Sequence, residues 1–145
     1  MRNIKLTLEK IKRELQTDTR ILALYLYGSQ SNGDAKRDSD IDLGVLFYQG
    51  ENHSLLDEGG LSAKLARFGN IHVNILNDKS PLFRFKAIYP QKVVFCKNAG
   101  ERADFEVATR NEYNDIEPYL NEAYEASVEQ AKNNLCSTKK EFRKG

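Results

Sequence analysis

The chain has 145 residues, with 22 Lys or Arg, 21 Asp or Glu and a formal net charge of +1. This balance gives no overall attraction to nucleic acid or to a membrane surface. The longest apolar run, Ile21–Tyr27, is far shorter than the roughly 20 residues that span a bilayer.

The N-terminus and the cysteines indicate a reducing compartment. Met1–Lys5 lacks the apolar core of a signal peptide. Cys96 and Cys136 are too few and too far apart for a disulfide framework or a zinc site. We therefore expect a cytoplasmic protein with enough core to fold as a single domain.

The spacing of apolar residues predicts the elements of the first half of the chain. It predicts an amphipathic helix over Ile4–Leu15. The run Ile21–Tyr27 predicts a strand buried on both faces, and residues 40–47 predict a second strand. Gly59-Gly60 disfavours helix, because each Gly costs roughly 1 kcal/mol against Ala. We therefore expect helix only over Leu61–Arg67, after a mobile stretch.

The second half predicts short elements and then a long helical segment. Ser80 and Pro81 suit a helix N-terminus, and Pro118 predicts that one helix ends near Asn114 and another begins. The expected elements are strand Ile71–Leu76, helix Leu82–Ile88, edge strand Val93–Cys96, helices from Glu101 to residue 136, and a polar, disordered tail over residues 137–145. The predicted fold class is α/β (α+β): one domain over residues 1–136, with a small mixed sheet, helices packed on it and a C-terminal helical segment.

The residues that carry chemistry lie where the first predicted strand ends and the second begins. Asp40 and Asp42 are two apart on a strand, so their side chains share one face. Adjacent carboxylates repel each other unless a cation lies between them, and Mg²⁺ prefers oxygen ligands and keeps a substrate's phosphates among them. Gly28-Ser29 lets backbone N–H groups approach a phosphate. Each piece alone is ordinary, but together they predict a phosphate cradle beside a cation site.

A polar stretch of ten residues, Gln30–Ser39, connects these two strands. A solvated loop is polar by default, so charges there need no function. Arg37 is nevertheless a candidate ligand of a triphosphate, because its guanidinium bonds phosphate oxygens in a fork. We take Gly28, Ser29, Arg37 and Ser39 as the candidate nucleotide-binding residues.

The chain has Gly28-Ser29, then ten residues, and then Asp40-Ile41-Asp42. This pattern resembles the signature of the DNA polymerase β-like nucleotidyltransferases. The sequence of Ser39–Leu43 resembles that of the minimal nucleotidyltransferase (MNT) subgroup. The proteins of this subgroup are the antitoxins of HEPN-domain ribonuclease toxins. The resemblance covers Leu24 to Phe95 and is weaker beyond. It implies a nucleotidyltransferase fold, ATP as substrate, and Mg²⁺ or Mn²⁺ held by Asp40 and Asp42. It also implies a type VII-like toxin–antitoxin pair, in which AMP is transferred to a tyrosine hydroxyl of the cognate HEPN toxin and inactivates it.

The resemblance also implies a third carboxylate on the next strand, facing the other two. In this chain that position falls on His72 or Asn74, and Asp78 lies beyond the strand's expected end. With one fewer charge the site binds Mg²⁺ more weakly. His72 could instead act as a neutral base or accept a softer ion such as Mn²⁺. We therefore keep His72 as a candidate catalytic residue, with a surface histidine of no catalytic role as the alternative.

The missing carboxylate leaves two other functions open. One is a non-catalytic antitoxin that neutralises the toxin by direct binding. The other is a nucleotidyltransferase that acts on a small molecule. The lack of an added substrate-binding domain argues against this second function. In the C-terminal segment, Tyr113, Tyr119 and Tyr124 either cover the domain's own sheet or meet a partner, because aromatic residues are enriched at interface cores. We expect a hetero-oligomer with the toxin and no direct binding of nucleic acid.

Overall fold

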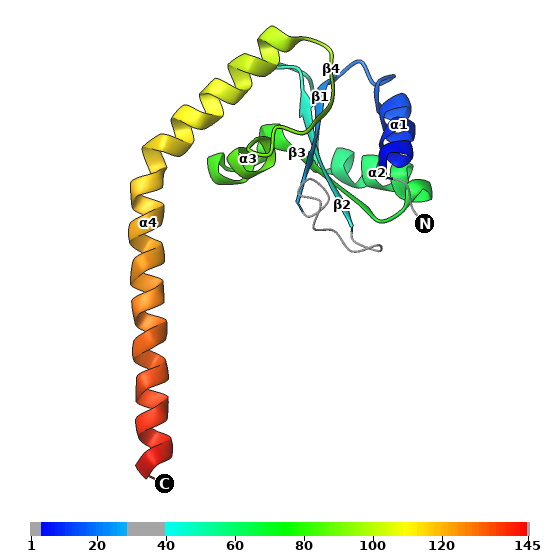
Figure 1. Ribbon diagram of the computed structural model, residues 1–145. Helices are drawn as coiled ribbons and strands as arrows, with labels where there is room; N and C mark the ends of the chain where they lie inside the picture. The colour runs from blue at the N-terminus through cyan, green and yellow to red at the C-terminus, as the bar shows by residue number, and fades with distance from the viewer. Residues whose placement is uncertain (1–3, 29–39, 145) are drawn as a thin grey trace. The chain divides into compact units, whose positions relative to one another are not determined.

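The computed structural model of the protein describes residues 4–28 and 40–144, with side chains through Leu135. The chain divides into two compact units, Met1–Arg110 and Asn111–Gly145. The elements are α1 (Ile4–Leu15), β1 (Ile21–Tyr27), β2 (Ile41–Phe47), α2 (Leu55–Leu65), η1 (Ala66–Phe68), β3 (Ile71–Ile75), η2 (Leu76–Asp78), α3 (Pro81–Ile88), β4 (Val93–Cys96) and α4 (Ala99–Lys144) (Figure 1).

The sheet of the first unit has the strand order β3-β2-β1-β4. Strand β1 is antiparallel to both β2 and β4, whereas β2 and β3 are parallel. A parallel pair needs a crossover connection, which α2 supplies. The predicted mixed sheet is therefore confirmed, and so is the edge position of β4.

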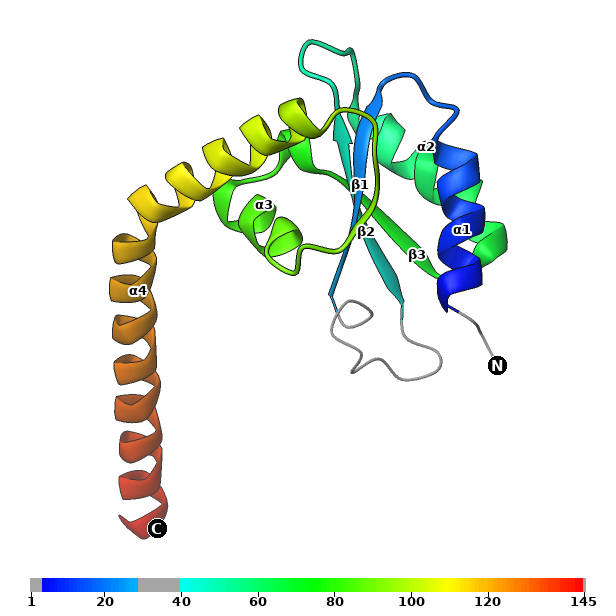
Figure 2. The same ribbon diagram turned by 45° about the horizontal axis from the view of Figure 1, so that its top comes forward.

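Helices cover both faces of the sheet, as Figure 2 shows with α1 and α2 on one side and α3 on the other. One core cluster joins β1, β2 and β3 to α1 and α2, and the other joins the opposite face to α3. Strand β1 contributes Leu24 to the first cluster and Tyr25 to the second, so its predicted burial on both faces is confirmed. The side chains of β2 that enter the first cluster are Ile41, Leu43, Val45 and Phe47.

The first turns of α4 are bound to β1 by a buried polar contact. The Tyr25 hydroxyl donates to Oε1 of Glu106 at 3.0 Å, and both side chains are buried. Burial raises the pKa of Tyr25, and the Glu106 carboxylate beside it raises the pKa further. The phenol therefore stays protonated and remains a donor to Glu106.

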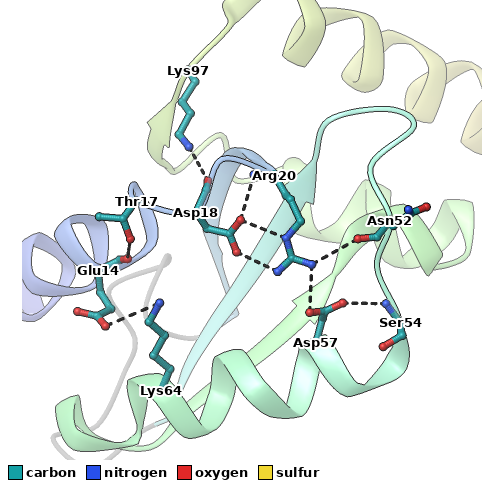
Figure 3. Close-up of polar contacts among 9 residues, drawn as sticks. All are labelled: Glu14, Thr17, Asp18, Arg20, Asn52, Ser54, Asp57, Lys64 and Lys97. Carbon is teal, nitrogen blue, oxygen red and sulfur yellow. Dashed lines mark hydrogen bonds and ion pairs between the residues drawn. The ribbon is translucent and has the colours of Figure 1, made fainter.

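Arg20 joins three segments at the end of the sheet remote from Gly28 (Figure 3). Its guanidinium bonds both oxygens of Asp18, at 3.2 and 3.0 Å, and Oδ1 of Asp57 at 3.2 Å. It also donates to the carbonyl of Asn52 at 3.3 Å. These contacts hold the start of β1 against the N-terminus of α2 and the loop before it.

Helix α2 begins at Leu55, so the prediction that helix starts only at Leu61, after a mobile stretch, is wrong. Ser54 and Asp57 form a capping box: the amide of Leu56 donates to the Ser54 hydroxyl, and the Ser54 amide donates to the Asp57 carboxylate. Such a cap stabilises a helix by about 1 kcal/mol. Together with the Arg20 bond to Asp57, it offsets the unfavourable Gly59-Gly60.

Helix α4 is continuous, so the predicted end near Asn114 is wrong, and Pro118 lies inside the helix. A proline removes one helical hydrogen bond, but the residues on both sides keep helical backbone here. The helix also continues to Lys144, where the sequence predicted a disordered tail, because Lys, Glu and Arg are good helix formers. The domain boundary at residue 136 stays a prediction. Among the described residues, no helix has the length and apolar character of a membrane-spanning segment.

Candidate active site

The two aspartates of the motif lie at the start of β2. Asp40 directly precedes the strand and is exposed, whereas Asp42 is half-buried on the face opposite Ile41 and Leu43. Burial raises the pKa of the Asp42 carboxyl above its ordinary value. The His72 imidazole lowers that pKa and the Asp40 carboxylate raises it, so both groups lie close enough to affect the ionisation of Asp42.

Gly28 brings the end of β1 against the Asp42 carboxylate. Tyr27 pairs with Asp42 across the antiparallel strands, which places Gly28 next to the acid. Gly28 has a φ of 76°, in the left-handed region that favours glycine. A Cβ on Gly28 would overlap Oδ2 of Asp42. The corner therefore needs glycine both for its backbone conformation and for the space that the carboxylate occupies.

His72 joins the acid pair from the neighbouring strand. In the parallel register of β2 and β3 it lies opposite Asp42, and its Nε2 is 3.0 Å from Oδ2 of Asp40. Its side chain remains 61% exposed, so solvent and ligands can reach it. The structure thus brings three of the predicted catalytic residues to one place: Asp40, Asp42 and His72.

Asn74, the other candidate for the third-carboxylate position, is engaged elsewhere. Its Nδ2 donates to the Tyr27 hydroxyl at 2.6 Å. Burial raises the pKa of Tyr27 to about 12, which keeps the phenol protonated. Sequence reasoning did not find Tyr27 as a residue of the site. On β3, His72 lies opposite Asp42 and Asn74 lies two residues further on. These two positions therefore hold an imidazole and a neutral amide, and neither is a carboxylate.

The predicted nucleotide-binding residues Ser29, Arg37 and Ser39 lie outside the residues that the structure describes. Within the described ranges, no group of three or more His, Cys, Asp or Glu is arranged to hold a metal ion. Asp40 and Asp42 nevertheless fit Mg²⁺, which proteins commonly bind through one or two carboxylates together with substrate phosphates. An ion here would depend on a nucleotide for its remaining ligands.

A pocket of about 490 Å³ adjoins the glycine corner. Aromatic rings and one cation line most of it: Tyr27, Gly28, Phe83, Phe85, Lys86, Tyr89 and Pro90. Tyr27 and Phe83 meet edge to face, with ring centroids 5.9 Å apart. A larger pocket of about 640 Å³ includes Leu22 and Leu46, toward the other end of the same strands, and none of the site residues lines it. The smaller pocket is therefore the one that can serve the acid pair.

Similar solved structures include two chains from toxin–antitoxin complexes. One comes from a crystal structure described as a toxin-antitoxin with AMP-PNP, with a TM-score of 0.67 and 20% identity over 86% of this chain and 98% of that chain. The other comes from a structure described as a tri-AMPylated Shewanella oneidensis HEPN toxin in complex with MNT antitoxin, with a TM-score of 0.67 and 19% identity over the same shares. At this identity the likeness shows the fold, and the predicted nucleotidyltransferase fold is confirmed.

Sequence comparison identifies the family. A curated relative from Methanocaldococcus jannaschii, "Putative protein adenylyltransferase MJ1215", is 32% identical over 77 residues, which cover 53% of this chain and 87% of the relative. The family model described as "Polymerase beta, Nucleotidyltransferase" matches residues 9–100, a range that contains Gly28, Asp40, Asp42, His72 and Asn74. The protein therefore belongs to the polymerase β nucleotidyltransferase family, as the resemblance of its motif indicated.

Proposed function

We propose that the protein is an antitoxin that transfers AMP from ATP to a tyrosine hydroxyl of a cognate HEPN-domain toxin and so inactivates it. The contact of the Gly28 backbone with the Asp42 carboxylate, beside Asp40, carries this proposal, because a metal-bound triphosphate needs a cradle and carboxylates together. The name of the Methanocaldococcus jannaschii relative and the AMPylated toxin in a similar complex support the substrate and the partner.

Each residue of the site has a distinct part in this proposal. Asp40 and Asp42 would hold Mg²⁺ or Mn²⁺, and the ion would supply positive charge that offsets the negative charge developing during transfer. Gly28 and Ser29 receive the β- or γ-phosphate. Arg37 and Ser39 contact the triphosphate, a role assigned from the sequence alone. The reaction belongs in the cytoplasm, where ATP is available.

The chemical step joins the acceptor oxygen to the α-phosphorus and breaks the bond between that phosphorus and the pyrophosphate. The proton of the acceptor hydroxyl passes to His72, acting as a neutral base. Oδ2 of Asp40, 3.0 Å from Nε2 of His72, orients the imidazole. The tyrosine then carries AMP, and pyrophosphate leaves.

The aromatic pocket beside Gly28 suits the adenine of ATP. Its rings present flat apolar surface on which a base can stack, and stacking is worth about 1–3 kcal/mol per base. Lys86 adds a cation to the same lining. A nucleotide with its phosphates at Gly28 can thus place its base in a pocket that begins at the same glycine.

Labelling with ATP that carries ³²P at the α-phosphate tests the proposal. The protein is incubated with its HEPN partner and either Mg²⁺ or Mn²⁺, and the ribonuclease activity of the partner is followed in parallel. We expect label on the partner together with loss of its ribonuclease activity. Asp40→Asn/Asp42→Asn is expected to give no label and to leave the ribonuclease of the partner active. Asp104 is an exposed acid beside the larger pocket, so Asp104→Asn is expected to label and inactivate the partner as the wild type does. No label with either ion overturns the proposal.

A second function is supported by the contact between Asn74 and Tyr27. Because Asn74 is bound to a phenol and His72 replaces a carboxylate, the site has one fewer charge for Mg²⁺ than the family pattern implies. The alternative is an antitoxin that neutralises the toxin by binding alone. Full neutralisation by the Asp40→Asn/Asp42→Asn protein, without label transfer in either form, would establish this alternative.

A further inference from the structure

The second unit, Asn111–Gly145, is a stretch of helix α4 without a second element of its own. Helices in water owe most of their stability to packing of an apolar face. In the described part of this unit, Tyr119, Tyr124 and Leu135 expose 73%, 70% and 62% of their surface. The helix therefore presents large apolar side chains that an associating helix can cover.

Tyr124 and Leu135 belong to one continuous stripe. Residues three and four apart lie on the same face of a helix. Apolar residues follow that spacing through most of the unit: Tyr113, Ile116, Leu120, Tyr124, Val128, Ala131 and Leu135. An uninterrupted stripe of this kind is suited to pairing with another helix along its length.

The charges of the unit change sign near Ala131. Residues 111–131 contain six carboxylates and no Lys or Arg: Glu112, Asp115, Glu117, Glu122, Glu125 and Glu129. Residues 132–145 contain one carboxylate, Glu141, and five cations: Lys132, Lys139, Lys140, Arg143 and Lys144. The helix thus has an acidic half and a basic half that complement each other.

We infer that this unit pairs with the same unit of a second copy of the chain, antiparallel and centred near Ala131. In that orientation the acidic half of each helix lies beside the basic half of the other, and the two stripes meet around Ala131, from about Ser127 to Leu135. A parallel pair would place like charges together, which is unfavourable. Helix α4 extends about 20 Å beyond Ala131 at 1.5 Å per residue, so the two helices overlap over about 40 Å.

Sedimentation velocity of the full chain tests the pairing. We expect a dimer whose dissociation constant rises with salt, because the opposite charges are screened. Val128→Ser/Leu135→Ser, where the two stripes meet, is expected to weaken the dimer at least tenfold without changing charge. Leu56→Ser is the matched control, since Leu56 is 85% exposed on α2, outside the second unit. A wild-type chain that stays monomeric at micromolar concentrations overturns the inference and leaves the stripe to a different partner.

Charge reversal tests complementarity separately from packing. Glu122→Lys/Glu125→Lys/Glu129→Lys makes residues 118–131, the part of the acidic half that overlaps the partner, basic and is expected to dissociate the dimer. Adding Lys139→Glu/Lys140→Glu/Arg143→Glu restores opposite signs and is expected to restore the dimer. This recovery also excludes simple unfolding as the cause of dissociation. A dimer that persists after the first reversal, or that fails to return after the second, contradicts the proposed pairing.

Cysteine cross-linking tests the orientation. In a chain with Cys96→Ser/Cys136→Ser, Ala131→Cys lies near the symmetry axis and is expected to form an intermolecular disulfide. Leu120→Cys is expected to form none, because two such residues lie about 30 Å apart in the antiparallel pair. Equal cross-linking at both positions would indicate parallel helices. The association and these tests are independent of nucleotide transfer, so they can fail while the proposed activity stands.

Discussion

The Asp42 carboxylate occupies the space that a side chain on Gly28 would need. The contact depends on the register of β1 and β2, in which Tyr27 lies opposite Asp42, and on the left-handed backbone of Gly28. It brings the end of β1, where a glycine lets a ligand approach the backbone closely, beside an acid suited to a cation. The geometry of this contact leads to the first prediction.

Gly28→Ala is expected to abolish nucleotide binding and to destabilise the protein. A Cβ in the left-handed region costs about 1–2 kcal/mol, and the displaced Asp42 adds to this loss. Gly50→Ala is the matched control, because Gly50 has a φ of 88° but no atom within 4 Å of an added Cβ. Urea denaturation and titration with a fluorescent ATP analogue measure both effects. Equal losses of stability in the two variants, with nucleotide binding retained, would contradict the role of the contact.

His72→Ala is expected to lower kcat for AMP transfer by about 10²–10⁴-fold, the usual contribution of a general base. The KM for ATP should change little, because the carboxylates and the glycine corner remain. His53→Ala, which removes the only other histidine, should leave kcat unchanged. A third variant, His72→Asp, supplies the carboxylate of the family pattern and should tighten Mg²⁺ binding, measured by calorimetry. Unchanged kcat in His72→Ala would remove the base role.

Tyr27→Phe is expected to lower the free energy of unfolding by about 1 kcal/mol, because it removes the hydrogen bond from Asn74 and keeps the ring. The edge-to-face contact with Phe83 should survive. A double-mutant cycle with Asn74→Ala isolates the pair. Coupling near zero by urea denaturation would mean that the hydrogen bond contributes no stability.

The sequence was sufficient for the parts of the site that depend on local periodicity. Alternation along β2 placed Asp40 and Asp42 away from the core, and alternation along β3 placed His72 and Asn74 opposite the apolar residues. The contact of Asn74 with Tyr27 could not be predicted in this way. It joins β3 to β1 across β2, so it depends on the order of strands in the sheet.

Helix boundaries failed where local propensity was overruled. Gly59-Gly60 led to the prediction that no helix precedes Leu61, but Ser54, Asp57 and the distant Arg20 stabilise the start of α2. The pattern Ser54-x-x-Asp57 is the signal that could have revealed this cap. Pro118 similarly indicated a helix end, yet α4 accommodates it. The roles of Ser29, Arg37 and Ser39 stay predictions.

Gly59→Ala and Gly60→Ala should each stabilise the protein by roughly 1 kcal/mol, because both glycines lie inside α2. An added Cβ meets no atom within 4 Å at either position, so no clash offsets the gain. Urea denaturation measures the change, with Gly50→Ala as the control at a left-handed position that should lose stability. Destabilisation by the α2 substitutions would show that the glycines serve another purpose in the helix.

The His53–Asp78 pair predicts that stability falls as the solution becomes alkaline. Nε2 of His53 lies 2.8 Å from Oδ1 of Asp78, and this bond raises the pKa of His53 above 6.5. Partial burial lowers the pKa of His53, whereas the Glu51 carbonyl and the Asp57 charge raise it. Because the folded state binds the proton more tightly, the contribution is complete below pH 6.5 and is lost as pH rises through the folded pKa. The pair is partly exposed, so the effect should not exceed about 1 kcal/mol. Urea denaturation from pH 6 to 9 should show a fall in the free energy of unfolding of the wild type and no such fall in Asp78→Asn. An NMR titration that places the His53 pKa at or below 6.5 would refute this prediction.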